Sequence, residues 1–159
     1  MLFRSYQEVP VKSEALKITG HSDGILVGYG DPLLLEIKSV GVGSFRYENP
    51  DLFYKHDGDF AKMWADFKNP FMSHIMQAQI YLHLVELDEK IEHKPQEIVF
   101  LYHGKPNDEI KEIVVPKSSF GITEILEAAE MIVSATSAPS CNVPEKFKTD
   151  CAKCRGYND

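Results

Sequence analysis

Two apolar stretches separated by a sharp turn constrain the fold of this chain most strongly. Residues 18–41, ITGHSDGILVGYGDPLLLEIKSVG, place strand-forming residues on both sides of Gly30-Asp31-Pro32, a strong turn signal. The predicted strands of this first part of the chain are 5–11, 15–20, 24–29 and 33–39. Their short spacing predicts an antiparallel meander.

The rest of the chain alternates between helix and strand signals. The predicted elements are an irregular segment over 41–58, a short helix over 60–67, a helix opened by Asn69-Pro70 and ending near Asp88, strands at 96–103 and 109–115, and a helix over 118–135 capped by Ser118 or Ser119. This order predicts an α/β fold of the α+β kind, in which helices flank a central mixed β-sheet. We expect a core over residues 1–136 and a cysteine-containing tail over 137–159.

Composition limits the class of protein. The 159 residues suffice for one domain, and 43% apolar with 26% charged residues is ordinary for a soluble globular protein. The sequence contains neither a run of 18 apolar residues nor a signal-peptide pattern, so we expect a cytoplasmic protein with no membrane partner. A net charge of −7 counts against a generally basic surface and against nucleic acid as a partner, although a local basic groove can lie on an acidic protein.

The strand over 33–39 ends in an acid and a base. Side chains alternate along a strand, so Glu36 and Lys38 share one face while Ile37 faces the other. A hairpin with the preceding strand brings Asp23 near Glu36. Two carboxylates and a backbone carbonyl suit Mg²⁺ or Mn²⁺, and a neighbouring lysine can act on a water or on developing negative charge. The alternative is a solvent-exposed ion pair of little energetic consequence.

A second group of residues lies on the helix after Asn69-Pro70. His74, Gln77 and Tyr81 are spaced i, i+3 and i+7, which places them on one helical face. Taken alone, Gln77 and Tyr81 also fit an i, i+4 pair at the edge of the core.

Together the two stretches resemble the PD-(D/E)XK nuclease superfamily, in its RecB-like branch with the CRISPR-adaptation and phage exonucleases. That branch has a G-x-x-D strand, a D/E-x-K strand and a helix with Q-x-x-x-Y. The matching residues are Gly20-His21-Ser22-Asp23, Glu36-Ile37-Lys38 and Gln77-Ala78-Gln79-Ile80-Tyr81, with His74 three residues before the glutamine. The resemblance covers about residues 5–155 and implies a restriction-endonuclease-like core.

The resemblance implies a role for each matching residue. Asp23, Glu36 and the Ile37 carbonyl would bind the metal, and Lys38 would assist the attacking water. Gln77 and Tyr81 would orient the substrate or the catalytic groups, and His74 would contact the phosphate backbone. The family usually begins with a helix that contributes an acidic residue or histidine, whereas this chain begins with strand-like residues.

The cysteines fit the same branch. Several members hold a [4Fe–4S] cluster through one early cysteine and three late ones, and Cys141, Cys151 and Cys154 would be the late three. The Cys-x-x-Cys spacing also suits zinc, with a histidine as the fourth ligand. Free thiols are the remaining interpretation.

These observations predict a metal-dependent DNA nuclease, with an exonuclease of recombination, repair or phage DNA processing as the first hypothesis. The second is a nuclease-fold DNA-binding subunit with weak or no cleavage, working with a helicase, a recombinase or a single-strand-binding protein. In a third interpretation, the chain is a metal protein without nuclease activity, and the Glu-x-Lys pair is incidental. The segment over 41–70 interleaves basic and aromatic residues, which suits either single-strand binding or core packing.

Overall fold

The structure is a computed structural model, and it describes residues 4–28, 30–119 and 121–135. The elements in chain order are β1 (Arg4–Ser13), β2 (Ile18–Val27), β3 (Leu33–Val40), α1 (Val42–Glu48), α2 (Pro50–Lys55), α3 (Phe60–Asp66), α4 (Met72–Leu87), β4 (Glu97–Gly104), β5 (Glu109–Pro116) and α5 (Ile122–Ser134). The predicted tail over 137–159 lies outside the described residues. Within the described part, no helix is both long and apolar enough to cross a bilayer.

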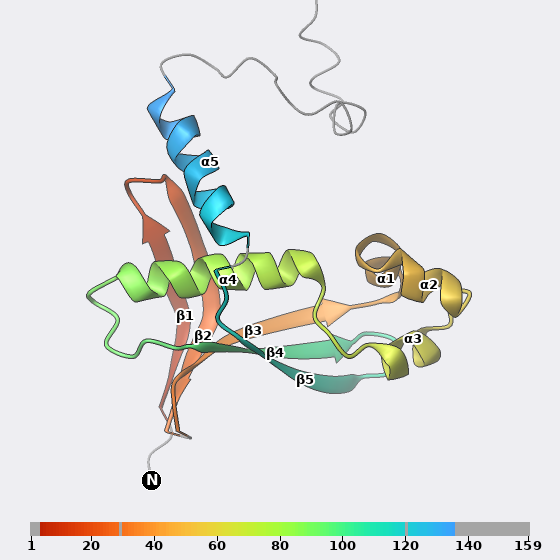
Figure 1. The fold of residues 1–159 in the computed structure, drawn as a ribbon. Coiled ribbons are helices and arrows are strands. Elements are labelled where there is room, and N and C mark those ends of the chain that lie inside the picture. Colours follow the sequence, from red (N-terminus) through yellow and green to blue (C-terminus); the bar gives the residue numbers. More distant parts are fainter. Residues whose placement is uncertain (1–3, 29, 120, 136–159) are drawn as a thin grey trace, which may run out of the picture.

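The five strands form one mixed sheet in the order β1-β2-β3-β4-β5. β1, β2 and β3 pair antiparallel, as do β4 and β5, but β3 and β4 pair parallel. Parallel neighbours need a crossover connection, and the chain from α1 to α4 provides it. Figure 1 shows α4 crossing one face of the sheet, with α1, α2 and α3 gathered beyond one end. The predicted α+β class, a mixed sheet flanked by helices, is confirmed.

The meander contains three strands, and the prediction of four was wrong. Parts of the predicted strands 15–20 and 24–29 belong to a single strand, β2, because Gly20 and Gly24, which flank the expected break, lie inside the sheet and do not interrupt it. Gly24 is paired with Leu35 of β3, and Gly20 with Val11 of β1. Glycine inside a strand often marks a close approach of another group, and Gly20 has such a neighbour in the site described below.

The prediction of an irregular segment over 41–58 was also wrong, because two short helices occupy it. Asn49 caps α2 by accepting a hydrogen bond from the Leu52 N–H, and Pro50 takes the first helical position. This Asn-Pro signal is the same one that had suggested a helix start at residue 69. There the structure differs, because the N-cap of α4 is Phe71.

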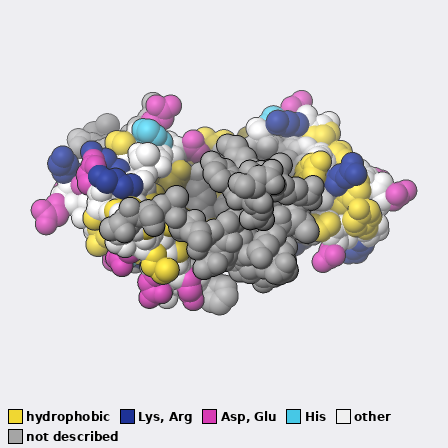
Figure 2. Space-filling model, turned by 90° about the horizontal axis from the view of Figure 1, so that it is seen from above, with side chains coloured by type: hydrophobic (Ala, Val, Ile, Leu, Met, Phe, Trp, Pro, Cys, Tyr) yellow, Lys and Arg dark blue, Asp and Glu magenta, His cyan; other side chains and the backbone are white. Residues whose placement is uncertain are grey.

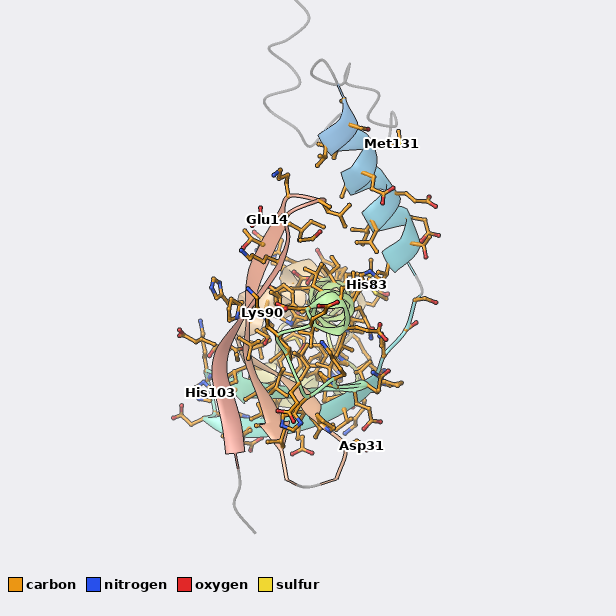
Figure 3. The ribbon with its side chains drawn as sticks, turned by 90° about the vertical axis from the view of Figure 1, so that its left-hand side faces the viewer. Glu14, Asp31, His83, Lys90, His103 and Met131 are labelled. Carbon is orange, nitrogen blue, oxygen red and sulfur yellow. The ribbon has the colours of Figure 1, made fainter. Side chains whose placement is uncertain are left out.

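The start of α5 also lies later than predicted. Its N-cap is Gly121, in the left-handed conformation with φ of 73°, and neither Ser118 nor Ser119 takes that position. The helix then projects away from the sheet, and Figure 3 shows Met131 near its far end. That side chain is 73% exposed.

Aromatic rings fill the core between the sheet and the crossover helices. Phe45 of α1 is fully buried, and its ring lies edge-on to those of Phe60, Phe67 and Phe71, with centroids 5.3–5.8 Å apart. Edge-to-face pairs of this kind add stability beyond the apolar area they bury. This cluster fixes the end of β3 and the start of α4 relative to each other, and the candidate site lies between these two elements.

Candidate active site

Strand β3 presents the acid and base on the side of the sheet that α4 covers. Leu34, Glu36 and Val40 are buried and Lys38 is partly buried, whereas Ile37 between them is 52% exposed. The predicted alternation of faces along this strand is therefore present. The parallel partners of Glu36 and Lys38 on β4 are Phe100 and Tyr102.

Glu36 is a carboxylate buried almost completely, with 2% of its surface exposed. One oxygen, Oε2, accepts a hydrogen bond of 2.7 Å from Lys38 Nζ, and the other, Oε1, has no partner among the described residues. Burial raises the pKa of Glu36, Lys38 opposes that rise, and the charge of Asp23 adds to it. A buried carboxylate with an unpaired oxygen favours the approach of a cation.

Asp23 lies within β2, although it falls between the predicted strands 15–20 and 24–29. The backbone pairing of β2 with β3 extends to Gly24 and Leu35, and beyond that pair the Asp23 side chain hydrogen-bonds to β3. Its Oδ2 accepts a hydrogen bond of 2.6 Å from the Ile37 N–H. Asp23 therefore reaches the strand segment that carries Glu36, close enough to influence its pKa.

The two carboxylates fit the predicted divalent cation. The unpartnered Oε1 of Glu36 and the neighbouring Asp23 supply hard oxygen donors, which Mg²⁺ and Mn²⁺ prefer. The residues that the structure describes contain no cluster of three or more His, Cys, Asp or Glu side chains suited to a metal. The predicted site differs from such a cluster, because its third ligand is the Ile37 carbonyl.

Helix α4 meets this strand through Gln77. The Gln77 Oε1 accepts a hydrogen bond of 2.9 Å from Lys38 Nζ, and its Nε2 donates one of 2.9 Å to the Tyr81 hydroxyl. A continuous polar chain thus runs from Glu36 through Lys38 and Gln77 to Tyr81. The structure places these residues together, as the resemblance implied, and their chemical roles stay predictions.

Gly20 of β2 packs directly against the ring of Tyr81. A Cβ atom at this glycine would be 2.6 Å from Cε1 of the Tyr81 ring, which is closer than two carbons approach without displacement. The glycine and tyrosine of the two sequence motifs are therefore in direct contact. Glycine is needed here because the tyrosine ring occupies the space of a side chain.

His74 lies one turn before Gln77 and contacts a residue that the sequence reasoning missed. Its Nδ1 is 2.8 Å from the hydroxyl of Tyr102 on β4. Burial lowers the pKa of His74, the charge of Lys38 lowers it further, and Glu48 acts in the opposite direction. Only the parallel pairing of β3 with β4, which places Tyr102 beside Lys38, would have pointed to this tyrosine.

The aromatic and basic residues of the segment over 41–70 are divided between core and surface. Trp64 and Phe67 are buried with Phe45, whereas Tyr47 and Tyr54 are 82% and 72% exposed. Figure 2 shows apolar, basic and acidic side chains mixed at the end of the molecule where α1, α2 and α3 lie. Core packing therefore explains several of these aromatics.

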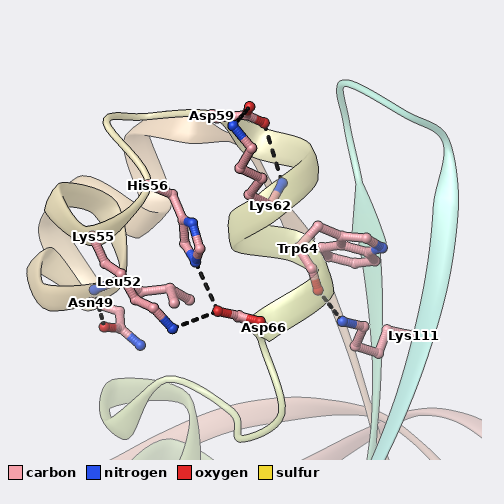
Figure 4. A network of polar contacts seen from close by, with 9 residues as sticks. All are labelled: Asn49, Leu52, Lys55, His56, Asp59, Lys62, Trp64, Asp66 and Lys111. Carbon is pink, nitrogen blue, oxygen red and sulfur yellow. Dashed lines mark hydrogen bonds and ion pairs between the residues drawn. The ribbon is translucent and has the colours of Figure 1, made fainter.

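Basic residues of this segment are partly neutralised by acids. Lys55 and His56 both contact Asp66, at 2.7 and 2.8 Å, and Lys62 contacts Asp59 at 3.0 Å (Figure 4). The two partners hold the pKa of Asp66 at about 2. This segment therefore offers less free positive charge than its sequence suggests.

The predicted cysteine ligands, Cys141, Cys151 and Cys154, lie outside the described residues. No known protein-family profile matches the chain, and no curated relative matches it. Among solved structures, that of a Sulfolobus protein titled "Crystal structure of SSO0001" aligns with a TM-score of 0.48 and 21% sequence identity. The alignment covers 94% of this chain and 61% of that one, so the chain spans about three fifths of that protein's length. No function follows from this similarity.

Proposed function

We propose that this protein is a divalent-metal-dependent deoxyribonuclease, an exonuclease that acts in the cytoplasm in recombination, repair or phage DNA processing. The observation that carries the proposal is the position of Lys38. Its Nζ contacts Glu36 of the strand motif at 2.7 Å and Gln77 of the helix motif at 2.9 Å. Two motifs that are far apart in sequence converge on one ammonium group, which an incidental surface ion pair would not require.

The metal would be held by Asp23, Glu36 and the Ile37 carbonyl. A Mg²⁺ or Mn²⁺ ion supplies a Lewis acid that polarises a phosphoryl oxygen and lowers the pKa of a bound water. The buried Oε1 of Glu36, which has no hydrogen-bond partner in the described part of the chain, supports this assignment, because a cation would satisfy it. The partial burial of Lys38, whose side chain is 18% exposed, strengthens its electrostatic effect.

The protein side chains would position and stabilise the reacting groups. An ammonium has three N–H donors, and Glu36 and Gln77 take two of those of Lys38, among the residues described. The third is left for a water or for a phosphate oxygen as negative charge develops. In the hydrolysis, the water gives up one proton as its oxygen bonds to phosphorus, the bond from phosphorus to the leaving sugar oxygen breaks, and that sugar oxygen takes up a proton.

The test is digestion of single- and double-stranded DNA labelled at either end, with Mg²⁺, with Mn²⁺ and with EDTA. We expect metal-dependent loss of label, and a fall of about 100- to 1,000-fold in turnover for Lys38→Ala. Lys12→Ala is the matched control, because Lys12 is exposed and contacts only Glu14 among the side-chain pairs described. Equal turnover in the two variants would contradict a role for Lys38.

The alternative function predicts a different result in the same assay. Wild-type protein that binds DNA but leaves it intact in every metal would support a DNA-binding subunit of a helicase, recombinase or single-strand-binding complex. Protein that neither binds nor cleaves DNA would contradict both functions.

Purification without oxygen tests the cysteine prediction, since a brown protein that contains iron supports a [4Fe–4S] cluster at Cys141, Cys151 and Cys154.

A further inference from the structure

Tyr102 is the most deeply buried polar side chain beside the candidate site. It is 0% exposed and lies on β4, in register with Lys38 of β3. Phe67 meets its ring edge-on at 4.9 Å between centroids, and Phe100 stacks on it at 5.9 Å. Because a buried hydroxyl requires a hydrogen-bond partner, its contact with His74 is important.

The direction of that hydrogen bond follows from the burial of the hydroxyl. Burial raises the pKa of Tyr102 well above its usual range, so the phenol keeps its proton. Among the described residues, the geometry gives this hydroxyl one hydrogen-bond partner, Nδ1 of His74 at 2.8 Å. Because a buried O–H that donates to no acceptor is costly, the hydroxyl donates its proton to Nδ1.

This bond determines which nitrogen of His74 carries the proton. Burial and the nearby Lys38 disfavour the charged imidazole, so the ring is neutral and has one N–H and one acceptor nitrogen. Nδ1 accepts from Tyr102, and the proton therefore lies on Nε2. The two rings are also stacked, with centroids 5.7 Å apart and an interplanar angle of 25°, which holds the imidazole plane in place.

We propose that Tyr102 is a positioning residue: it holds His74 in the Nε2–H form, so that this nitrogen donates a hydrogen bond to a phosphate oxygen of the DNA strand. The inference rests on the proposed nuclease function, because it requires a phosphate to reach the helix face that carries His74 and Gln77. The arrangement parallels that of metal- and substrate-binding histidines, whose second nitrogen is oriented by a hydrogen bond.

The first test is spectroscopic and needs no activity. Long-range ¹H–¹⁵N correlation spectra of the full chain, labelled with ¹⁵N-histidine, report the tautomer of each ring, and His74→Gln identifies the signals of His74. We expect the Nε2–H form in the wild type and a mixture of tautomers in Tyr102→Phe. Phe100→Leu is the control, because it disturbs the packing around Tyr102 and retains the hydroxyl. A wild-type ring protonated on Nδ1, or an unchanged spectrum in Tyr102→Phe, would overturn the inference.

The second test couples the two residues kinetically. Loss of one neutral hydrogen bond should lower turnover by about two- to tenfold in Tyr102→Phe. The same substitution should cause no further loss when His74 is already glutamine, because Tyr102 acts only through that ring. Equal losses in both backgrounds would refute the positioning role. Wild-type protein that cleaves no DNA would contradict the proposed function, while the spectra would still decide the tautomer.

Discussion

Replacing Glu36 with glutamine tests the metal site most directly. Glu36 is 2% exposed, and its Oε1, which no described residue contacts by a hydrogen bond, is the strongest structural argument for a cation. Glutamine keeps the shape of the side chain but removes the charge. We therefore expect Glu36→Gln to fold and to lose the divalent ion.

The expected size of the effect follows from binding linkage. An ion at 100 times its Kd stabilises the folded protein by about 2.7 kcal/mol. For a chain of this length each kcal/mol raises Tm by about 2 to 4 °C, so the wild type should gain about 5 to 11 °C. A variant whose Kd is 100-fold higher retains about 0.4 kcal/mol at the same concentration, which is a shift of about 1 °C.

Thermal unfolding with and without Mg²⁺ or Mn²⁺ measures this difference. The matched control is Glu14→Gln, which makes the same chemical change at an exposed glutamate paired with Lys12, and it should keep the full shift. Equal shifts in the wild type and in Glu36→Gln, or no shift in the wild type, would refute the metal assignment.

Without metal, the stabilities of the wild type and of Glu36→Gln should depend differently on pH. Because the pKa of Glu36 is raised in the folded state, its contribution to stability is fully present below the unfolded value and is lost as the pH rises through the folded value. In EDTA, the wild type should therefore lose stability relative to Glu36→Gln as the pH rises from about 4 to neutrality. A constant difference between the two unfolding free energies would contradict the burial effect.

Three further predictions concern the surroundings of the site. Gly20→Ala should displace Tyr81, destabilise the fold by about 1 to 3 kcal/mol and slow cleavage. Gly43→Ala is the control for urea unfolding, because no described atom lies within 4 Å of its new Cβ, and it should leave the free energy of unfolding unchanged. Phe45→Ala should lower the free energy of unfolding by about 3 to 5 kcal/mol, because its fully buried ring anchors the crossover. The pKa of Asp66 is about 2 in the folded protein, so its carboxylate stabilises the fold at any pH above its unfolded pKa. The difference in free energy of unfolding between the wild type and Asp66→Asn should therefore vanish as the pH falls through the folded pKa.

Local patterns predicted the elements that depend on short-range contacts. The turn at Gly30-Asp31-Pro32, the hairpin of β4 and β5 and the short helix α3 all follow from alternation, from turn residues or from i, i+3, i+4 spacing. Element ends were less predictable. Several signals compete for a helix start, and the structure uses Phe71 and Gly121 where Asn69 and a serine had been expected.

The sequence alone determined the composition of the candidate site. Alternation placed Glu36 and Lys38 on one face of a strand, and helical spacing placed His74, Gln77 and Tyr81 on one face of a helix, because both periods are properties of the backbone. No local rule could bring these faces together.

The tertiary structure decided which side chains meet. The parallel pairing of β3 with β4 brought Tyr102 beside Lys38, and the packing of α4 on the sheet set Gln77 at 2.9 Å from Lys38. These contacts join residues separated by tens of positions, and they depend on how the whole aromatic core is packed. The close approach of Gly20 to Tyr81 has the same origin, since these two residues are distant in sequence and come into contact only when α4 packs on the sheet.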